Sequence, residues 1–574
     1  MKAPSRAKAQ AGAKLLKEHA RTQKAQSVKS ATPVTSYLLG AAAQRAMQGS
    51  RSGYGNYGAS DKKIGLQEWK AYSGSPDEDI TLNLPLLRAR SRDLFMGTPL
   101  AAAAILTLDV NVVGTGLVPM PQVDGEVLGK SSDECAQLNK FLSDEFKVFA
   151  NTCEIDWARR STFYQLQSLV FINQAISGDV LVMLPTKERV NAQAGSPYKT
   201  RVRLIEADRV MSAIKLEEIS EELTDGGSPK IFGGVELSQD GEVVAYWVCN
   251  RHPANMSLAM LSMLTEADFT RVPVFGEETG RAVALLVGEM ERPEQRRAVP
   301  LMSKCLTELK NLSRYIESTT VRTVIQSYFT AFVTSQMPST EMFTGLVDDS
   351  AMQDLVTRDP YTVHLGPGIV NWMRPGDKIE FPINSGPEAE FEPYVTALCK
   401  FIGAALGIPF EVLLKTFNAS YSASRASLLQ FWARVKVMRQ MLVDQFCQPV
   451  YETWMTEGVA QGIIRAPGFS TDPRIFRAWT RCSWSGASPG SIDPVKESQA
   501  AEKRIKLGVS TQERESLEIN GSDWRANTIQ QGLEKILADE NDLPYARSAT
   551  PSPFGGGGFG GGGSSDDNEG EKEE

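Results

Sequence analysis

Residues 408–442 read IPFEVLLKTFNASYSASRASLLQFWARVKVMRQML. From Glu411 to Asp444 the chain has 32 consecutive residues without an acidic side chain, although its formal net charge is −8. Five basic residues lie in this interval: Lys415, Arg425, Arg434, Lys436 and Arg439. A positive strip on a net-negative protein suits contact with a polyanion, because Lys and Arg beside phosphates release condensed counterions whatever the base sequence. The alternative is a solvated helix face that binds nothing.

The strip is predicted to start as a hydroxyl-rich loop over 408–424 and to continue as a long helix from Arg425. Ser422 or Ser424 would cap this helix. Pro449 would kink or end it, because proline lacks a backbone donor and clashes with the preceding turn. An apolar stripe with helical spacing supports the helix: Leu428, Trp432, Val435, Met438, Leu442 and Phe446.

The composition is that of a globular protein. The chain has 574 residues, of which 42% are hydrophobic and 23% charged, and this length predicts three or four domains. Charged and polar residues interrupt every apolar run before it is long enough to cross a bilayer, so no integral membrane protein is expected. The seven cysteines are scattered without a CxxC pair, and the three histidines are far apart. We therefore expect neither a metal nor another cofactor.

Both ends of the chain differ in composition from the middle. The first 30 residues have eight basic side chains against only Glu18, and QGSRSGYGNYG follows from Gln48. Residues 1–81 are therefore predicted to be a flexible basic arm and linker. The C-terminal PSPFGGGGFGGGGSSDDNEGEKEE has too few apolar residues to fold, so 541–574 is predicted to be a disordered Gly-rich acidic tail.

The part between the arm and residue 300 is predicted to be α+β. Helical patterns cover LNLPLLRARSRDLFMG from Leu82, a second helix capped by Thr98 and Pro99 and ended by Gly114, and the intervals 133–150 and 162–177. Short β-branched or alternating runs then predict strands: GDVLVMLP from Gly178, TRVRLIEADRV from Thr200 and GEVVAYWVCN from Gly241.

Two long helices are predicted on either side of a small insert. Pro300 begins an apolar stripe that includes Leu301, Cys305, Leu309, Leu312, Ile316, Val324 and Tyr328. At about 1.5 Å per residue, some 30 residues would form a rod of about 45 Å. A strand-rich insert follows over 334–381, and a second helix over 387–406 has Phe391, Tyr394, Leu398, Phe401 and Ile402 on one face. Gly407-Ile408-Pro409 stops it.

Four stretches resemble the lambda-family portal proteins of tailed bacteriophages, encoded by a phage or a prophage. They are LRARSRDLFMGTPLAAAAILTLDVNVVGTG from Leu87, GDVLV from Gly178, ALGIPFEVLLKTFNASYSASRASLL from Ala405 and IDPVKESQAAEKRIKLGVSTQERESLEINGSDW from Ile492. The resemblance covers about 82–538. The family usually has an Asn-Tyr-Ser-Ser run before its Arg, whereas this chain has Ser-Tyr-Ser-Ala-Ser before Arg425.

The resemblance implies a structural protein rather than an enzyme. Portal proteins form a ring, usually of twelve copies, at one capsid vertex, through which double-stranded DNA enters during packaging and leaves during ejection. The expected partners are other copies of the chain, double-stranded DNA without sequence specificity, the terminase large subunit, the major capsid or scaffolding protein and head-completion proteins. The expected location is the virion, after assembly in the bacterial host cytoplasm.

The resemblance also implies a portal-type division of the chain. In order, the parts are a wing at 82–299, a first stem helix at 300–333, a clip at 334–386, a second stem helix at 387–407, a tunnel loop at 408–424, a tunnel helix and returning wing at 425–492, and a crown at 493–540.

Residues of the tunnel loop and tunnel helix become candidates for contact with DNA: Lys415, Asn418, Ser420, Ser422 and Arg425. Lys415 and Arg425 are the strongest of these, and charge reversal at both is expected to lower the amount of packaged DNA while rings stay intact. The alternative for Arg425 is an ion pair with a carboxylate of a neighbouring subunit. Arg434, Lys436 and Arg439 are candidates for the channel or for subunit contacts. They cannot all face one way on a helix, so at least one of them should be a packing or intersubunit residue.

Catalytic motifs are sparse. The sequence has neither a G-x-x-x-x-G-K-[ST] loop nor H-E-x-x-H, so a packaging motor would be a separate protein. The stretch 486–490, GASPG, matches the G-x-S-x-G pattern and leaves a soluble serine hydrolase using Ser488 as the alternative function. That chemistry needs a strand before the serine and a helix after it, whereas Pro489 and Gly490 indicate a turn. Trp484 is expected to pack against the DPVKE segment.

Overall fold

The computed structural model describes residues 74–188, 196–212, 230–328, 332–335, 377–380, 388–416, 420–490 and 494–543. Two units divide the chain: Met1–Ser75, of which only Gly74 and Ser75 are described, and Pro76–Glu574. The second unit is treated below. Most of the predicted basic arm and most of the predicted tail lie outside the described residues.

The predicted arm is too long at its C-terminal end, because order begins before Leu82. Helix α3 (Pro76–Asp79) and the 3-10 turn η2 (Thr81–Asn83) precede α4. Asp77 pairs with Arg296 at 3.3 Å and Asp79 pairs with Arg292 at 2.7 Å. These arginines are more than two hundred residues away in the sequence. Local composition therefore could not predict that residues 76–83 are ordered by ion pairs with them.

The next two helices agree with the sequence prediction. Helices α4 (Leu84–Gly97) and α5 (Pro99–Val112) meet at a bend of 95°. Pro99 lies in the first turn of α5, where its missing N–H has no helical partner to lose. Among the described residues no single helix is long and apolar enough to span a membrane; only the bent pair Pro76–Gly97 and Pro99–Val112 meets those criteria together.

Helices α6 (Gly125–Leu128), α7 (Ser132–Ala150) and α8 (Phe163–Ser177) follow. A capping box starts α7, because the Ser131 hydroxyl accepts from the Glu134 N–H while the Glu134 carboxylate accepts from the Ser131 N–H. The predicted periodicity is confirmed at Phe146 and Phe163, which are buried. Phe141 and Leu169 continue the same patterns but remain 43% and 44% exposed.

The strands form small antiparallel sheets, which confirms the α+β class. Strand β2 (Asp179–Met183) lies between β3 (Arg203–Glu206) and β8 (Ala284–Gly288). A four-stranded sheet has the order β4 (Ile231–Phe232), β5 (Val235–Leu237), β6 (Val243–Cys249), β7 (Phe269–Pro273). Short helical turns lie between the helices and strands of this part of the chain: η3 (Cys153–Ile155), η4 (Ala207–Arg209), η5 (Pro253–Asn255), α10 (Leu258–Leu261) and η6 (Glu266–Asp268).

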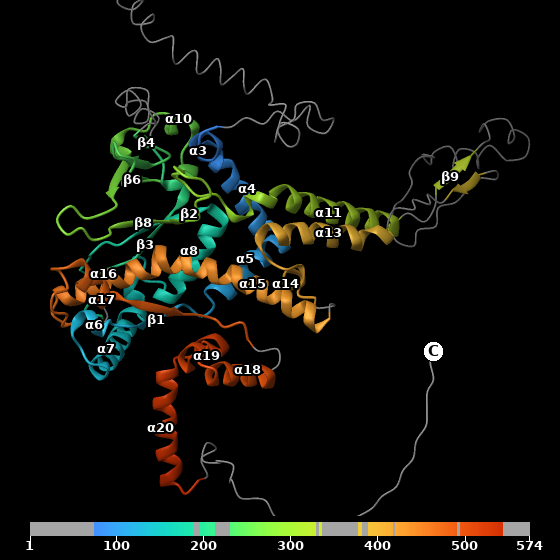
Figure 1. Ribbon diagram of the computed structural model, residues 1–574. Coiled ribbons are helices and arrows are strands. Elements are labelled where there is room, and N and C mark those ends of the chain that lie inside the picture. Colours follow the sequence, from blue (N-terminus) through green and yellow to red (C-terminus); the bar gives the residue numbers. More distant parts are fainter. Residues whose placement is uncertain are drawn as a thin grey trace, which may run out of the picture. The chain divides into compact units, whose positions relative to one another are not determined.

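The two predicted long helices lie side by side (Figure 1). Pro300 is followed by a 3-10 segment, η7 (Leu301–Cys305), and then by α11 (Leu306–Tyr328), which returns as α13 (Glu388–Leu406). Rings of the two helices meet, since the Tyr315 centroid lies 5.6 Å from that of Phe391 and 4.7 Å from that of Tyr394. Of the predicted insert, strands β9 (Phe332–Ser335) and β10 (Asp377–Glu380) are described and pair antiparallel.

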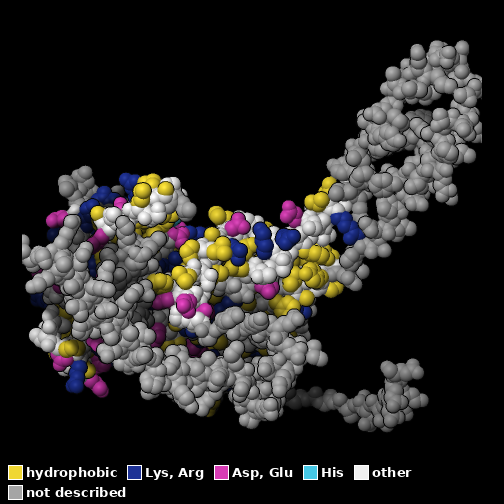
Figure 2. Space-filling model, turned by 90° about the horizontal axis from the view of Figure 1, so that it is seen from above, with side chains coloured by type: hydrophobic (Ala, Val, Ile, Leu, Met, Phe, Trp, Pro, Cys, Tyr) yellow, Lys and Arg dark blue, Asp and Glu magenta, His cyan; other side chains and the backbone are white. Residues whose placement is uncertain are grey.

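The apolar stripes of the long helices are buried only in part. Leu309 and Leu312 are buried where α11 contacts α4 and α13, whereas Ile316 and Val324 are 42% and 48% exposed. On α13, Phe401 is 67% exposed. Figure 2 shows such hydrophobic side chains on the molecular surface beside Lys and Arg side chains. Periodicity therefore predicted the helices correctly but not which apolar residues one chain buries by itself.

The helix after the strip continues past Pro449 instead of ending there. Helix α15 (Tyr421–Leu442) leads into a π-helical turn, η8 (Val443–Cys447), and then into α16 (Gln448–Ala460). A proline lacks the N–H for the usual bond and clashes with the carbonyl four residues earlier, and the wider π-turn relieves both problems. The turn also directs Gln445 at the end of β8, where its amide donates to the Gly288 carbonyl at 3.1 Å and accepts from the Gly288 N–H at 2.9 Å.

The core beneath α15 and α16 is rich in aromatic rings. The predicted stripe of α15 is confirmed, because Val435, Leu442 and Phe446 are fully buried. In the described part of the chain, the ring contacts of Trp484 are with the aromatic core instead of the DPVKE segment: its ring lies 6.4 Å from Phe146 and 6.2 Å from Tyr451, and its indole N–H donates to Gln448. Strand β11 (Cys482–Ser485) holds this tryptophan by pairing with β1 (Val118–Pro121).

The described C-terminal part is helical. Helix α17 (Pro473–Thr480) precedes β11, and α18 (Pro494–Lys506), α19 (Gln512–Asn520) and α20 (Trp524–Glu540) follow it. Gly521 ends α19 in the left-handed conformation at φ 70°, which favours glycine. The Ser485 hydroxyl donates to the Gly521 carbonyl at 2.8 Å, so this turn is tied to the end of β11.

Candidate nucleic-acid interface

Most described residues of the predicted loop over 408–424 are helical, which corrects the sequence prediction. Residues FEVLL form α14 (Phe410–Leu414), because Glu411 and Leu413 are buried against the rest of the chain. Helix α15 already starts at Tyr421, so neither Ser422 nor Ser424 caps it. Ser420 takes the N-cap position without a side-chain cap bond. Helix α14 thus ends at Leu414 and α15 begins at Tyr421, and Asn418 lies outside the described residues.

Lys415 is the exposed cation of this connection. It caps the C-terminus of α14 in the left-handed conformation at φ 56°, and its N–H donates to the Glu411 carbonyl. A non-glycine residue in this region is uncommon, so the backbone position is specified by its surroundings. Within the described ranges of the chain, Lys415 has no ion-pair partner. Its charge is therefore available to a ligand.

Two other predicted cations are paired with carboxylates from the C-terminal helices. Arg425 approaches Glu497 of α18 at 3.8 Å, and Lys436 approaches Glu518 of α19 at 3.7 Å. The side chains of Arg425 and Lys436 are 40% and 62% exposed. Exposed pairs of this kind contribute about 0–1 kcal/mol, so they orient the cations without removing them from solvent.

The remaining two cations contact segments far away in the sequence. Arg434 pairs with Glu289, just after β8, at 3.1 Å. Arg439 is half-buried and donates to three carbonyls, those of Asn111 and Val112 at the end of α5 and that of Ala487. Burial lowers the pKa of Arg439. Arg439 thus joins α5, α15 and the segment after β11, and among the three candidates for channel or subunit contacts it serves packing within the chain.

Replacement of Arg439 by Ala should destabilise the protein. The change removes three hydrogen bonds to partly buried carbonyls. Water can replace these bonds in part, so the expected loss is about 1–3 kcal/mol in all. The expected result is a clearly lower denaturant midpoint in urea unfolding followed by circular dichroism. Lys436→Ala is the matched control on the same helix and should change the midpoint little. Equal losses in the two variants would contradict a packing role for Arg439.

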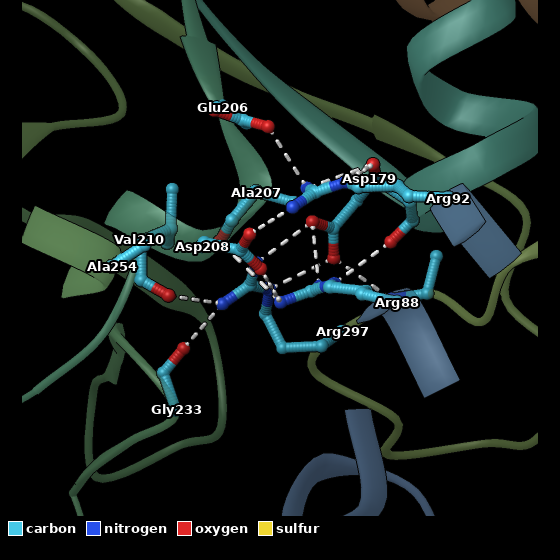
Figure 3. Close-up of polar contacts among 12 residues, drawn as sticks. Arg88, Arg92, Asp179, Glu206, Ala207, Asp208, Val210, Gly233, Ala254 and Arg297 are labelled. Carbon is cyan, nitrogen blue, oxygen red and sulfur yellow. Dashed lines mark hydrogen bonds and ion pairs between the residues drawn. The ribbon is translucent and has the colours of Figure 1, made fainter. Parts of the chain in front are cut away.

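The main charged cluster of the described structure was not predicted from the sequence. Asp179, at the start of β2, is fully buried and lies between two arginines (Figure 3). Arg88 of α4 donates to it at 3.1 Å, while Arg297 donates through two nitrogens at 2.8 and 2.7 Å. The backbone N–H of Ala298 adds a bond at 3.0 Å. The two arginines are 91 and 118 residues away from Asp179, so no local pattern announces the cluster.

The remaining donors of the cluster are largely used on backbone carbonyls. Arg297 donates to Ala207, Val210 and Gly233, and Arg88 donates to Ser177. Burial by itself would raise the pKa of Asp179, but the charges of Arg297 and Arg88, with the hydrogen bonds from Arg297 and Ala298, hold it below its usual value. A buried charge network of this kind is tolerated because its members satisfy one another.

A neighbouring group could be mistaken for a metal centre. The ligand atoms of Glu206, Asp208 and His252 all lie within 4.8 Å of one another. Arg92 already pairs with both carboxylates (Figure 3). His252 contacts Glu206 at 3.0 Å. A metal ion would have to displace or repel the Arg92 guanidinium, so the group is an ion-pair extension of the Asp179 cluster.

The position of Ser488 does not favour hydrolysis. Strand β11 does precede it, but 486–490 is not helical and α18 starts only at Pro494. In the described part of the chain, no hydrogen bond joins Ser488 to a histidine. The strand-to-helix turn that exposes a catalytic serine is therefore not formed.

Comparison with known proteins identifies the class. The model of the family described as phage portal protein, lambda family, matches residues 64–439, about two thirds of the chain. The chain belongs to the lambda family of phage portal proteins, and its function is that of a portal at the capsid vertex.

Two phage portal proteins are similar to this chain over most of its length. Portal protein B of Escherichia phage lambda is 22% identical over 549 residues, which cover 90% of this chain and 96% of that protein. The portal protein of Escherichia phage N15 is 21% identical over 528 residues, covering 88% and 94%. Among solved structures, a chain from the neck of a native GTA particle computed with C12 symmetry is 10% identical, with a TM-score of 0.42 and coverage of 77% of this chain and 94% of that one.

Proposed function

We propose that copies of this portal protein assemble into a twelve-membered ring that conducts double-stranded DNA into the capsid during packaging and out of it during ejection. The observation that carries the proposal is the family match over 64–439, which spans the long helices α11 and α13 and the segment with Lys415. Exposed apolar side chains on α11 and α13, such as Ile316 and Phe401, support it, because neighbouring copies in a ring would cover them.

The parts of the ring follow the division made from the resemblance. Residues 82–299 would form the wing, with 425–492 as tunnel helix and returning wing. Helices α11 and α13 would form the stem, the insert between them the clip, and 493–540 the crown. The clip would dock the terminase large subunit and later the head-completion proteins, while the major capsid or scaffolding protein would meet the ring during its assembly in the host cytoplasm.

Lys415 is our first candidate for contact with the DNA. A channel that passes any sequence needs weak, reversible contacts with the phosphate backbone, since tight binding by each copy would stall translocation. One exposed cation per subunit meets this need, because the ring repeats it in every copy. Ser420 and Ser422 are exposed nearby and would offer hydroxyl contacts, and Arg425 would add a partly neutralised charge.

Electron microscopy of the purified full-length chain tests the ring. Negative-stain images should show uniform annular particles, and two-dimensional averages should show twelvefold symmetry. Measurements at low and at high salt guard against rings that depend on charge screening. A uniform monomer under every salt condition would overturn the proposed function.

A further inference from the structure

Helix α20 has an uncovered apolar face. Ile529, Leu533, Ile536 and Leu537 are 56%, 51%, 56% and 58% exposed, and the helix has no buried residue at all. Spacings of four, three and one place these four side chains on one side of the helix, which we call the α20 face. A continuous apolar row of this kind is unfavourable in water and marks a surface that another molecule covers.

A second exposed apolar feature lies in the same helical region, directly after α18. Leu507 and Val509 are 77% and 70% exposed on either side of Gly508, and we call them the α18 corner. Their backbone is held by hydrogen bonds, because the Leu507 N–H donates to the Lys503 carbonyl and the Val509 N–H donates to the Arg504 carbonyl. The corner is therefore a formed turn that presents two apolar side chains.

The two surfaces carry opposite charges at their edges. Lys503, Arg504 and Lys506 lie in the last turn of α18, next to the corner. Arg504 and Lys506 pair with Glu515 and Glu502, whereas Lys503 has no ion pair within the described ranges. At the other surface, Asp539, Glu540 and Asp542 follow the α20 face and likewise have no described ion-pair partner. Both surfaces are thus apolar, and the charges at their edges are opposite in sign.

A second copy of the chain is the occupant that these observations favour. Both surfaces stay exposed in the single chain, so they do not cover each other within it. In a closed ring each copy meets its two neighbours through two different surfaces, which is the arrangement that two unlike but matching patches provide. A parallel pair of α20 helices would instead bring their acidic ends together.

We propose that the α20 face of one copy packs against the α18 corner of the neighbouring copy, so that the crown of the ring is closed by contacts between unlike surfaces. This inference rests on the proposed ring. It assigns the contact to named residues that lie outside the part of the chain matched by the family model.

Cysteine crosslinking in the full-length chain tests the contact. Leu507→Cys and Leu533→Cys are combined in a Cys153→Ser background, because Cys153 is an exposed native thiol. After treatment with a short bis-maleimide, a denaturing gel should show a ladder of covalent multimers that extends to the full ring. The matched control combines Leu507→Cys with Lys535→Cys, which lies on the opposite side of α20, and should give at least fivefold less multimer.

The outcomes separate this inference from the ring itself. Dimers from Leu533→Cys alone would show that two α20 faces meet, which would overturn the proposal. Rings seen by electron microscopy without a ladder above the Lys535→Cys control would also overturn it while leaving the proposed function standing. Samples without any rings would overturn both. All substituted side chains are exposed, and a thermal melt of each variant verifies that it is folded.

Discussion

Replacement of Asp179 by Ala should produce the largest loss of stability of any single change considered for this chain. The substitution leaves Arg88 and Arg297 buried without their common carboxylate, and removal of one partner from a buried ion pair costs about 3–5 kcal/mol. Because the cluster joins α4, β2 and the segment before η7, we expect a lower thermal midpoint together with a low soluble yield. Thermal unfolding followed by circular dichroism measures the first effect.

Two further variants serve as comparisons: Asp179→Asn tests the role of the charge, and Lys147→Ala is a control at an exposed ion pair. The asparagine keeps the shape but not the charge, so it should be destabilised nearly as much as the alanine variant. Lys147 belongs to an exposed pair with Asp144, and its removal should change the midpoint little. If Asp179→Asn were as stable as the natural chain, the charge of Asp179 would not hold the cluster together.

The same cluster predicts a pH dependence. The folded-state pKa of Asp179 is below the ordinary value of 3.8, so its stabilisation is fully present above that value and is lost as the pH falls through the lower folded pKa. The advantage of the natural chain over Asp179→Asn should therefore stay constant from neutral pH down to about pH 5 and shrink only in stronger acid. Urea midpoints of both chains across this range measure it.

Charge reversal at Lys415 should produce the largest loss of function without loss of structure. In the proposed ring, Lys415→Glu replaces a circle of positive charges by a circle of negative ones, which repels phosphates within about one Debye length, roughly 10 Å at 0.1 M salt. We expect the yield of DNA-filled particles to fall on the order of tenfold, because steering by charge changes association by factors of this size or more. Packaged DNA protected from nuclease measures the effect.

Lys436→Glu is the matched control, because Lys436 is also an exposed cation of the strip but pairs with Glu518. It should lower packaging much less than Lys415→Glu, and Arg425→Glu should fall between the two, since Arg425 shares its charge with Glu497. Rings of all three variants are counted by electron microscopy. Loss of rings in Lys415→Glu would place this residue at a subunit interface instead of in the channel.

Local patterns in the sequence predicted the elements that depend on neighbours in the chain. Helical spacing of apolar residues within 133–150 and within 162–177 predicted α7 and α8, and β-branched runs predicted β2 and β6. The loop prediction failed at 410–414. Asn418 and the serines after it suggested a loop that already began at residue 408, whereas 410–414 is helical. The helix is stabilised there because Leu413 is buried against other parts of the chain. Which residues lie beside Leu413 is set by the tertiary structure and not by the local sequence.

The amino-acid sequence was therefore sufficient to predict the α+β class and the family, and to identify the acid-free strip with its five cations. Only the tertiary structure distinguishes these cations, because Coulomb interactions act through space and not along the chain. Glu289, Glu497 and Glu518 approach the strip from distant segments, and Arg439 turns inward to backbone carbonyls. Lys415 is the cation of the strip that has no ion-pair partner among the described residues. The Asp179 cluster was likewise not predictable from the sequence, because its arginines are distant along the chain and meet the carboxylate only in the folded structure.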